Sequence, residues 1–434
     1  MLRRKITEQL NDWATHKDEK CLVVQGPTQA GKTYAVKQFA KERYKELVEI
    51  NFKQMPSAKE IFAKELTVDA MLLAMRFRFP DKKILPKKTL IFLDEIQECR
   101  EAITSLKSWA IDNRYDVIAS GSLLGVKETG AFAELTGYVD YVKVQGMDFE
   151  EFLWAMGLSS DVVTSVKHYL DQKMHVPMPL HQRMISYYRL FIATGGMPEA
   201  VAKFMENRDF REVDAVQRNL LQGYQYGIAH YAHTEEKSKA EKCYMTLARQ
   251  LLDNANHKFQ YKEIEKGARA QKYYASIEWL VRADMIQLCR LVTEVASDLD
   301  AHARDNFFRA YPTDLSLLMA MSDFSLKQHI VEDTLPADTK AGVYDCAVAD
   351  ALMKKGYPLY FYKNETRKLE LDFVIRQNGH PVPIDIKSKR SKARPLLKLL
   401  KKEGVTCGYK FIEGNICVSE EGIITLPFYM ASFL

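Results

Sequence analysis

The chain has 434 residues, of which 47% are apolar, and its 62 lysines and arginines against 57 acidic residues give a net charge of +5. At roughly 150 residues per domain this length predicts about three globular domains. The small net charge argues against a protein surface that is basic throughout and covered by nucleic acid. The chain begins with a polar segment and has no run of about 18 apolar residues, so we expect neither secretion nor a membrane span. The seven cysteines are far apart, which favours a reducing cytoplasm and no cysteine-bound metal.

The first recognisable pattern is a strand, a glycine-containing loop and a helix. A helical pattern over residues 6–15 precedes the apolar run Cys21–Val24, which is followed by the segment GPTQAGKT at Gly26–Thr33. A second helical pattern then continues to Tyr44. The segment matches G-x-x-x-x-G-K-[ST], the pattern of a loop that binds nucleotide phosphates between a strand and a helix.

Each residue type in this loop has a physical reason. Gly26 and Gly31 let the backbone curl so that its N–H groups face the phosphates. Lys32 supplies a positive charge to the outer phosphates, and the hydroxyl of Thr33 is a ligand for Mg²⁺. We therefore predict an ATP site that also contains the loop residues Pro27, Thr28, Gln29 and Ala30.

Two further apolar runs end in residues that suit the same site. Thr89–Leu93 is followed by Asp94 and Glu95; we expect Asp94 to hold Mg²⁺ through water and Glu95 to polarise the attacking water. The run Asp116–Ala119 is followed by Ser120, whose hydroxyl is a candidate sensor of the terminal phosphate. An ordinary turn is the alternative at this position.

The middle of the chain is predicted to be mainly helical, from about residue 150 to 256. Two short helical patterns, at residues 261–265 and 270–283, then precede the β-like run Met285–Val292, an order typical of a helix-turn-helix with a wing. Basic residues gather at the start of the second helix, where such modules contact DNA, namely Lys262, Lys266, Arg269 and Lys272. A packing role is the alternative, because the later face of this helix is apolar.

The last quarter contains a predicted β-hairpin with charged residues in its strands. The runs LELDFVI and PVPIDIK are joined through Asn378-Gly379, a strong turn signal. Asp372 and Asp385 lie inside these β-rich runs, where an acid is costly unless it binds a metal. Lys387 follows Asp385 by two residues and so shares its face. Two carboxylates can bind Mg²⁺, and a neighbouring lysine can activate a water for attack on a phosphodiester.

Together these motifs resemble those of a large group of bacterial and archaeal AAA-related ATPases with a C-terminal domain of unknown function, whose end resembles a restriction-endonuclease-like (PD-(D/E)xK) fold. The resemblance extends over the whole chain and rests on GPTQAGKT, LDEIQ (93–97), ASGS (119–122), MDFEEFL (147–153), TGGMPEAV (194–201), RAYPTDLSLL (309–318), ELDFVI (370–375) and PIDIKS (383–388). It implies that ATP and Mg²⁺ are the ligands, that Gln97 lies beside Asp94 and Glu95, and that Ser120 or Ser122 is the sensor.

The same resemblance implies a nuclease-like site in the C-terminal part. Asp372, Asp385 and Lys387 would form its core, and Asp345 stands where many relatives have a glutamate. Asp345, Asp372 and Asp385 would then be the metal ligands. Glu370, two residues before Asp372, is a further candidate for this site.

One departure from the family concerns an arginine. Where relatives usually have Gly-Arg after the sensor strand, this chain has Leu135-Thr136-Gly137-Tyr138. If the arginine stabilises transition-state charge, hydrolysis here is slow or uses another arginine such as Arg100 or Arg114. AAA relatives often form rings, so a homo-oligomer is one of the states that the resemblance allows. The missing arginine argues against a ring whose subunits share active sites.

A basic run follows the hairpin. Between Lys387 and Lys402 the chain has eight basic residues and no acid, and Lys363, Arg367 and Lys368 would extend the same patch. Such a run next to an acidic site suits a polyanionic phosphodiester. A solvated helix with a buried leucine stripe is the second interpretation, and the two are compatible.

We therefore predict an α/β protein of four parts: a P-loop NTPase (AAA-like) domain at 1–155, a helical lid or connector at 156–235, a winged-helix-like domain at 236–325 and a restriction-endonuclease-like α/β domain at 326–434. The favoured function is a DNA-processing protein in which ATP binding or hydrolysis controls the nuclease-like module. One alternative is an ATP-switched scaffold that holds DNA or an unidentified protein partner and cuts nothing. Another is an NTPase that binds only protein.

Overall fold

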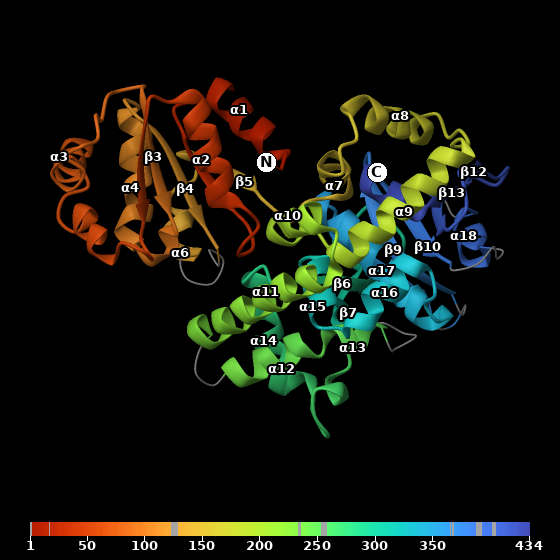
Figure 1. The fold of residues 1–434 in the computed structure, drawn as a ribbon. Coiled ribbons are helices and arrows are strands. Elements are labelled where there is room, and N and C mark those ends of the chain that lie inside the picture. Colours follow the sequence, from red (N-terminus) through yellow and green to blue (C-terminus); the bar gives the residue numbers. More distant parts are fainter. Residues whose placement is uncertain are drawn as a thin grey trace. The chain divides into compact units, whose positions relative to one another are not determined.

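The computed structural model describes residues 2–16, 18–122, 129–232, 236–252, 258–364, 366, 369–387, 393–401 and 405–434. Within these residues the chain forms two units (Figure 1). The first comprises Arg3–Gln145 with Arg282–Asp284, and the second comprises Gly146–Val281 with Met285–Leu434. No helix in the described part of the chain combines the length and the apolar character that a membrane span needs.

The first unit is built around a parallel sheet of five strands in the order β2-β3-β4-β1-β5. The strands are β1 (Cys21–Gln25), β2 (Glu46–Asn51), β3 (Thr89–Asp94), β4 (Asp116–Gly121) and β5 (Val139–Lys143). Three of them, β1, β3 and β4, follow the apolar runs that predicted them. A parallel sheet with helices on both faces buries its strands on both sides, which explains why these runs are continuously apolar.

Two helical layers pack on this sheet. The described helices are α1 (Ile6–His16), α2 (Lys32–Arg43), α3 (Val68–Arg78), α4 (Arg100–Asp112) and α6 (Thr129–Ala133), with short 3-10 turns at Pro56–Phe62 and Ile96–Glu98. Leu22 of β1 packs with residues of α1 and α2, whereas Val23 packs with residues of α3 and α4. Because all five strands run in one direction, their carboxyl ends meet at one edge, which brings the loop after β1 close to the ends of β3 and β4.

The second unit contains a mixed sheet of eight strands in the order β12-β13-β11-β10-β9-β8-β6-β7. The strands are β6 (Ile286–Val292), β7 (Ala303–Pro312), β8 (Leu359–Asn364), β9 (Leu369–Gln377), β10 (His380–Ile386), β11 (Gly408–Ile412), β12 (Cys417–Val418) and β13 (Ile423–Pro427). Strands β9 and β10 pair antiparallel across the turn at Asn378-Gly379, so the predicted hairpin is confirmed.

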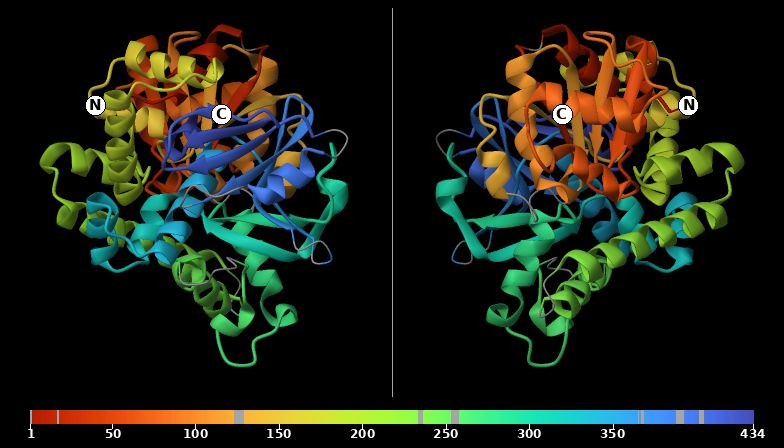
Figure 2. Two further views of the ribbon diagram at one scale, coloured as in Figure 1. Left: turned by 90° about the vertical axis from the view of Figure 1, so that its right-hand side faces the viewer. Right: turned by 90° about the vertical axis from the view of Figure 1, so that its left-hand side faces the viewer.

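This sheet continues across the predicted domain boundary at residue 325. Strands β6 and β7 form the antiparallel pair expected of a wing, after the helix α14 (Ala270–Arg282). However, β6 also pairs parallel with β8, with Arg290 opposite Tyr360, and the left view of Figure 2 shows the teal β6–β7 pair beside the blue strands. The backbone groups along the free side of β6 are therefore satisfied by β8, and the expected wing is part of the C-terminal sheet.

The remaining helices of this unit pack around the sheet and against one another. They are α7 (Phe149–Ala155), α8 (Ser160–Asp171), α9 (Met178–Thr194), α10 (Pro198–Asn207), α11 (Phe210–Tyr231), α12 (Lys237–Met245), α13 (Leu247–Leu252), α15 (Leu315–Ala320), α16 (Phe324–Glu332), α17 (Ala337–Lys354) and α18 (Arg394–Leu399), with 3-10 turns at Tyr261–Glu263, Asp300–His302 and Phe428–Phe433. The expectation of a mainly helical segment before the wing is met by α7 to α13.

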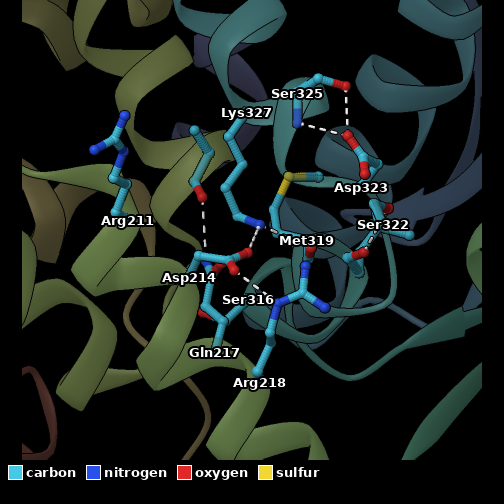
Figure 3. Close-up of polar contacts among 12 residues, drawn as sticks. Arg211, Asp214, Gln217, Arg218, Ser316, Met319, Ser322, Asp323, Ser325 and Lys327 are labelled. Carbon is cyan, nitrogen blue, oxygen red and sulfur yellow. Dashed lines mark hydrogen bonds and ion pairs between the residues drawn. The ribbon is translucent and has the colours of Figure 1, made fainter.

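Helix α11 is held to its neighbours by buried polar contacts (Figure 3). The ammonium of Lys327 on α16 is fully buried and donates to Oδ1 of Asp214 at 2.6 Å and to the carbonyl of Met319 at 3.0 Å. Burial lowers the pKa of Lys327. Gln217 on α11 donates to the carbonyl of Thr194 at 2.8 Å, so α11 is joined both to α16 and to the end of α9.

A second buried charge cluster joins three segments of this unit. Nζ of Lys354 lies 2.7 Å from Oδ2 of Asp314 and 2.9 Å from Oδ2 of Asp350, and all three side chains are at most 3% exposed. Oδ1 of Asp314 accepts the backbone N–H of Gly196 at 2.9 Å. Burial raises the pKa of Asp350 to about 7. Two of the segments noted for their family resemblance, TGGMPEAV and RAYPTDLSLL, therefore meet at this cluster and have a structural role there.

Candidate functional site

The loop between β1 and α2 has the backbone that its glycines predict. Gly26 has a φ of +150°, and a Cβ atom there would lie 1.9 Å from the carbonyl oxygen of Val144. Gly31, with a φ of +91°, is the residue before the first turn of α2. Only glycine fits the first position and only glycine adopts the second without strain. The structure thus places residues 26–33 as a tight loop that runs into a helix N-terminus.

Lys32 is buried inside this loop. Its side chain is 6% exposed, and Nζ donates to the carbonyl oxygens of Gly26 at 2.9 Å and Pro27 at 2.8 Å. Burial lowers the pKa of Lys32 to about 8, against the opposing effect of Glu95 and Asp94. An ammonium held within a curled loop can exchange these carbonyls for the outer phosphate oxygens of a nucleotide.

Asp94 is the centre of a polar cluster at the carboxyl edge of the sheet. It is 1% exposed, and its carboxylate accepts hydrogen bonds from the hydroxyl of Thr33 at 3.0 Å, from the amide of Asn51 at 2.7 Å and from the hydroxyl of Ser120. The predicted residues Thr33, Asp94 and Ser120 are therefore brought together. A threonine hydroxyl and a carboxylate beside a phosphate loop suit Mg²⁺, which takes its other ligands from phosphates and water.

Asn51 was not identified from the sequence. It is the last residue of β2 and is paired with Asp94 in the strand register. Its Oδ1 also accepts the backbone N–H groups of Lys53 at 3.1 Å and Gln54 at 2.9 Å. The signal that could have found it is the same as for Asp94, namely a polar residue directly after a β-rich run, here Leu47–Ile50.

Glu95 is positioned by Gln97, as the family resemblance implies. Nε2 of Gln97 donates to Oε2 of Glu95 at 2.7 Å, and Glu95 has a left-handed backbone with a φ of 53°. A non-glycine residue in this conformation is held there by its surroundings. The second carboxylate oxygen of Glu95, Oε1, has no such contact with Gln97. The role of Glu95 as the base stays a prediction.

The two alternative arginines differ in position. Arg114 precedes β4 and so lies at the amino edge of the parallel sheet, opposite to the phosphate loop, where it pairs with Asp69 at 2.7 Å and Asp112 at 2.8 Å. It cannot reach the site of its own chain. Arg100 begins α4 just after Asp94 and Glu95 and is exposed, so it lies at the correct edge.

The lowered pKa of Lys32 gives a pH prediction for ATP binding. A bound phosphate favours the charged ammonium, so the bound state retains the Lys32 proton at a pH where the free protein loses it. Above pH 8, the pKa of the free form, the dissociation constant for ATP should rise by up to about tenfold per pH unit. Isothermal titration calorimetry in two buffers of different ionisation enthalpy would show proton uptake above this pH. An affinity and a proton count that do not change between pH 7 and 9.5 would contradict the prediction.

The second predicted site lies where β9 and β10 pair. Nζ of Lys387 is 2.8 Å from Oδ1 of Asp385, which is fully buried, so these two residues share a face as predicted. Oδ2 of Asp372 accepts the backbone N–H of Ile386 at 2.7 Å. Burial raises the pKa of Asp372, and burial together with the charge of Asp372 raises the pKa of Asp385 to about 6.

A buried arginine that was not predicted lies among the acids. Arg309 on β7 is 1% exposed, and its guanidinium lies 3.5 Å from Asp345, 3.4 Å from Glu370 and 4.0 Å from Asp372. Its guanidinium carbon is also 4.7 Å from the ring centroid of Phe361. Sequence analysis named Arg309 only as the first residue of RAYPTDLSLL. No local signal in the sequence shows that its side chain forms ion pairs with acids from α17 and β9.

This arrangement does not suit the predicted metal ion. Across the described ranges, no three His, Cys, Asp or Glu side chains converge on one position for a metal. Asp345 accepts the hydroxyl of Tyr311 on one oxygen at 2.6 Å and lies 3.5 Å from Arg309 through the other, so both of its oxygens already have partners. The guanidinium supplies the positive charge that a cation would otherwise supply to Asp345, Glu370 and Asp372.

The predicted basic surfaces are described only in part. Lys262, Lys266 and Arg269 before α14 are exposed, whereas Lys272 pairs with Glu265. In the C-terminal basic run, residues 388–392 and 402–404 lie outside the described residues, as do Arg367 and Lys368. Leu396 and Leu399 of α18 are buried, which supports the expected leucine stripe.

Family comparisons cover the chain in three segments. Residues 18–153 match a family model described as an AAA domain, and this match agrees with the parallel sheet and the phosphate loop described above. The N-terminal unit is an AAA-related P-loop ATPase domain, a fold that binds nucleotides. Residues 185–328 and 340–429 match two models of domains of unknown function, DUF8612 and DUF4143, so the comparison does not support a nuclease fold at the C-terminus.

Comparisons with individual proteins are weaker. The chain is similar to the Walker-type ATPase of Pyrococcus abyssi at 15% identity, over 74% of this chain and 96% of that one, with a TM-score of 0.41. It is similar to AMPPCP-bound DnaA from Aquifex aeolicus at 12% identity (63% and 86%, TM-score 0.30) and to Aeropyrum pernix ORC1 in complex with DNA at 11% identity (76% and 91%, TM-score 0.29). These scores are too low to carry an argument about function. No curated protein matches the sequence.

Proposed function

We propose that this protein hydrolyses ATP and that its nucleotide state controls how the second unit engages DNA. The observation that carries the proposal is the cluster around Asp94, where hydroxyls from the phosphate-loop helix and from β4 and an amide from β2 meet one buried carboxylate. A cluster of this kind connects three parts of the domain to the place where the terminal phosphate is expected. Loss of that phosphate would therefore alter contacts of all three.

The residues have separate tasks in this reaction. Lys32 and the backbone N–H groups of the loop, other than Pro27, which has none, bind the phosphates, and Thr33 and Asp94 hold Mg²⁺. When bound, Mg²⁺ supplies positive charge to the phosphate oxygens during transfer. Glu95 accepts the proton of the attacking water through Oε1, while Gln97 holds Oε2 at 2.7 Å and so fixes the carboxylate. The hydroxyl of Ser120, which lies on β4, contacts the Asp94 carboxylate, so a movement of Asp94 would also move β4.

For the second unit we favour DNA binding without cleavage. Two of the three acids that would hold the metal, Asp345 and Asp372, lie beside the Arg309 guanidinium, and the third, Asp385, pairs with Lys387. The exposed cations before α14 suit phosphate contacts. A nuclease is the second candidate, and one observation favours it. Asp385 is fully buried, and among the residues that the structure describes neither of its carboxylate oxygens has a hydrogen-bond partner of good geometry.

A DNA assay separates these functions. We expect purified protein with Mg²⁺ or Mn²⁺ to leave supercoiled and linear DNA uncut, with or without ATP. We also expect DNA affinity to change when ATP is added to the wild type, and not to change in Lys32→Ala, which binds no ATP. Binding should weaken steeply with salt if phosphates are contacted; DNA binding that is absent at low salt would favour the protein-only alternative. Cleavage that is lost in Asp385→Ala would instead favour the nuclease.

A further inference from the structure

The second unit contains a cavity that shares only Lys363 and Glu370 with the predicted sites. It has a volume of about 650 Å³ and is lined by residues of β6, β7, β8 and β9 and by Lys258. The strand register pairs Leu291 with Phe361 and Lys363 with Glu370, which places these lining residues on one face of the sheet. The volume is within the range of about 300–1,000 Å³ typical of small-molecule sites.

The cavity is opened by an irregularity in β7. Arg290 is paired with Phe308, but the next residue, Leu291, is paired with Arg304. Asp305, Asn306 and Phe307 therefore have no register partner on β6, and all three line the cavity. Bulges of this kind are frequent beside functional sites, where they redirect side chains.

The charged groups of the lining favour an anion. Three cations, Lys258, Arg304 and Lys363, face two acids, Asp305 and Glu370. Glu370 lies 3.4 Å from Lys363 and 3.4 Å from the buried Arg309. Because Arg309 also faces Asp345 and Asp372, only the lining residues are counted, three cations against two acids. The cavity thus has an excess of positive charge.

An exposed aromatic ring lies beside these cations. Phe307 is 44% exposed, although it lies in a strand of a large sheet. Nζ of Lys258 is 3.8 Å from the centroid of its ring. An exposed ring next to a cation provides both a stacking surface for a base and a charge for a phosphate. The side chains of Thr293 and Asn306, also in the lining, can exchange hydrogen bonds with base edges.

We propose that this cavity binds one nucleotide of a single-stranded nucleic acid, with the base stacked on Phe307 and the phosphate near Arg304 and Lys363. Duplex DNA is not the ligand of the cavity, because its bases are already stacked on one another and their faces are inaccessible to a side chain. The inference depends on the proposed function in one respect, namely that the second unit binds nucleic acid. It adds that this part of the unit selects single-stranded over duplex nucleic acid.

The test compares single-stranded and duplex ligands by fluorescence anisotropy. The full-length protein, first without ATP and then with it, is titrated into a labelled oligothymidylate and into a labelled duplex of the same length. We expect Phe307→Ala to weaken oligothymidylate binding by about tenfold and to leave duplex binding unchanged. Phe307→Tyr, which keeps the ring, should bind as the wild type does. Phe77→Ala is the matched control, because Phe77 in the first unit is 79% exposed.

Each other outcome overturns the inference in a distinguishable way. If the wild type binds neither ligand, with ATP or without it, the proposed DNA function fails as well. If it binds both but Phe307→Ala and Phe77→Ala behave alike, only the cavity assignment fails. Displacement of oligothymidylate by thymidine monophosphate at similar concentrations would assign the cavity to a free nucleotide instead of a strand.

Discussion

Replacing Glu95 with glutamine should lower the turnover number of ATP hydrolysis by about 100- to 10,000-fold, the usual contribution of a general base. Glutamine keeps the size of the side chain and can still bond to Gln97, but it cannot accept a proton from water. ATP binding depends on Lys32 and the loop backbone, so the dissociation constant should change little. Steady-state phosphate release and equilibrium ATP titration measure the two quantities separately.

Glu101→Gln is the control for this change. Glu101 lies in the first turn of α4, a few residues after Glu95, and is exposed, so the substitution removes the same charge without touching the site. Wild-type turnover in Glu95→Gln would show that another group accepts the proton. Weakened ATP binding in both variants would show instead that the loss of turnover comes from the changed net charge at this edge of the sheet and not from a lost proton acceptor.

Replacing Lys354 with alanine should lower the free energy of unfolding by about 3–5 kcal/mol, since it leaves buried carboxylates without their counter-charge. Nζ of Lys354 contacts Asp314 and Asp350 and also donates to the carbonyl of Met147 at 3.1 Å. Asp314 cannot simply move to water, because its other oxygen is fixed by Gly196 and Ser316. Chemical denaturation followed by circular dichroism provides the measurement.

The control for this prediction is Lys203→Ala. Lys203 also pairs with acids, Glu206 and Glu212, but at the surface, where its side chain is 33% exposed. We expect no measurable change in stability, because exposed ion pairs contribute little. Equal effects of the two substitutions would mean that the Lys354 cluster is solvated in solution.

The parts that sequence predicted well are those with a local cause. The phosphate loop follows from glycines at two backbone positions and a fixed spacing, and β3 and β4 follow from apolar runs that end in polar residues. Asn51 ends its strand in the same way, yet one amide without a spacing pattern does not distinguish a site residue from an ordinary strand end. Its contact with Asp94 depends on the pairing of β2 with β3, which the order of the chain does not reveal.

The C-terminal site shows the same limit more strongly. The pairing of Asp385 with Lys387 is a matter of strand alternation and was predicted. Arg309 meets Asp345 and Glu370 only because β7 and β6 join β8 in one sheet, a long-range pairing between segments that the sequence had placed in separate domains. Sequence reasoning therefore described these acids without the guanidinium that lies beside them in the structure.

The continuity of this sheet also determines where the chain can be divided. A fragment that began at residue 326 would keep β8 but lose β6, and would expose a row of unpaired N–H and C=O groups along one strand. Exposed edges of this kind promote pairing with other molecules. The same fragment would lose Arg309, so the buried Asp345 and the half-buried Asp372 would lack the guanidinium that now lies beside them. A piece of the gene that ends at Gln145, in contrast, retains all five strands of the first sheet, and a piece that starts at Gly146 retains all eight of the second.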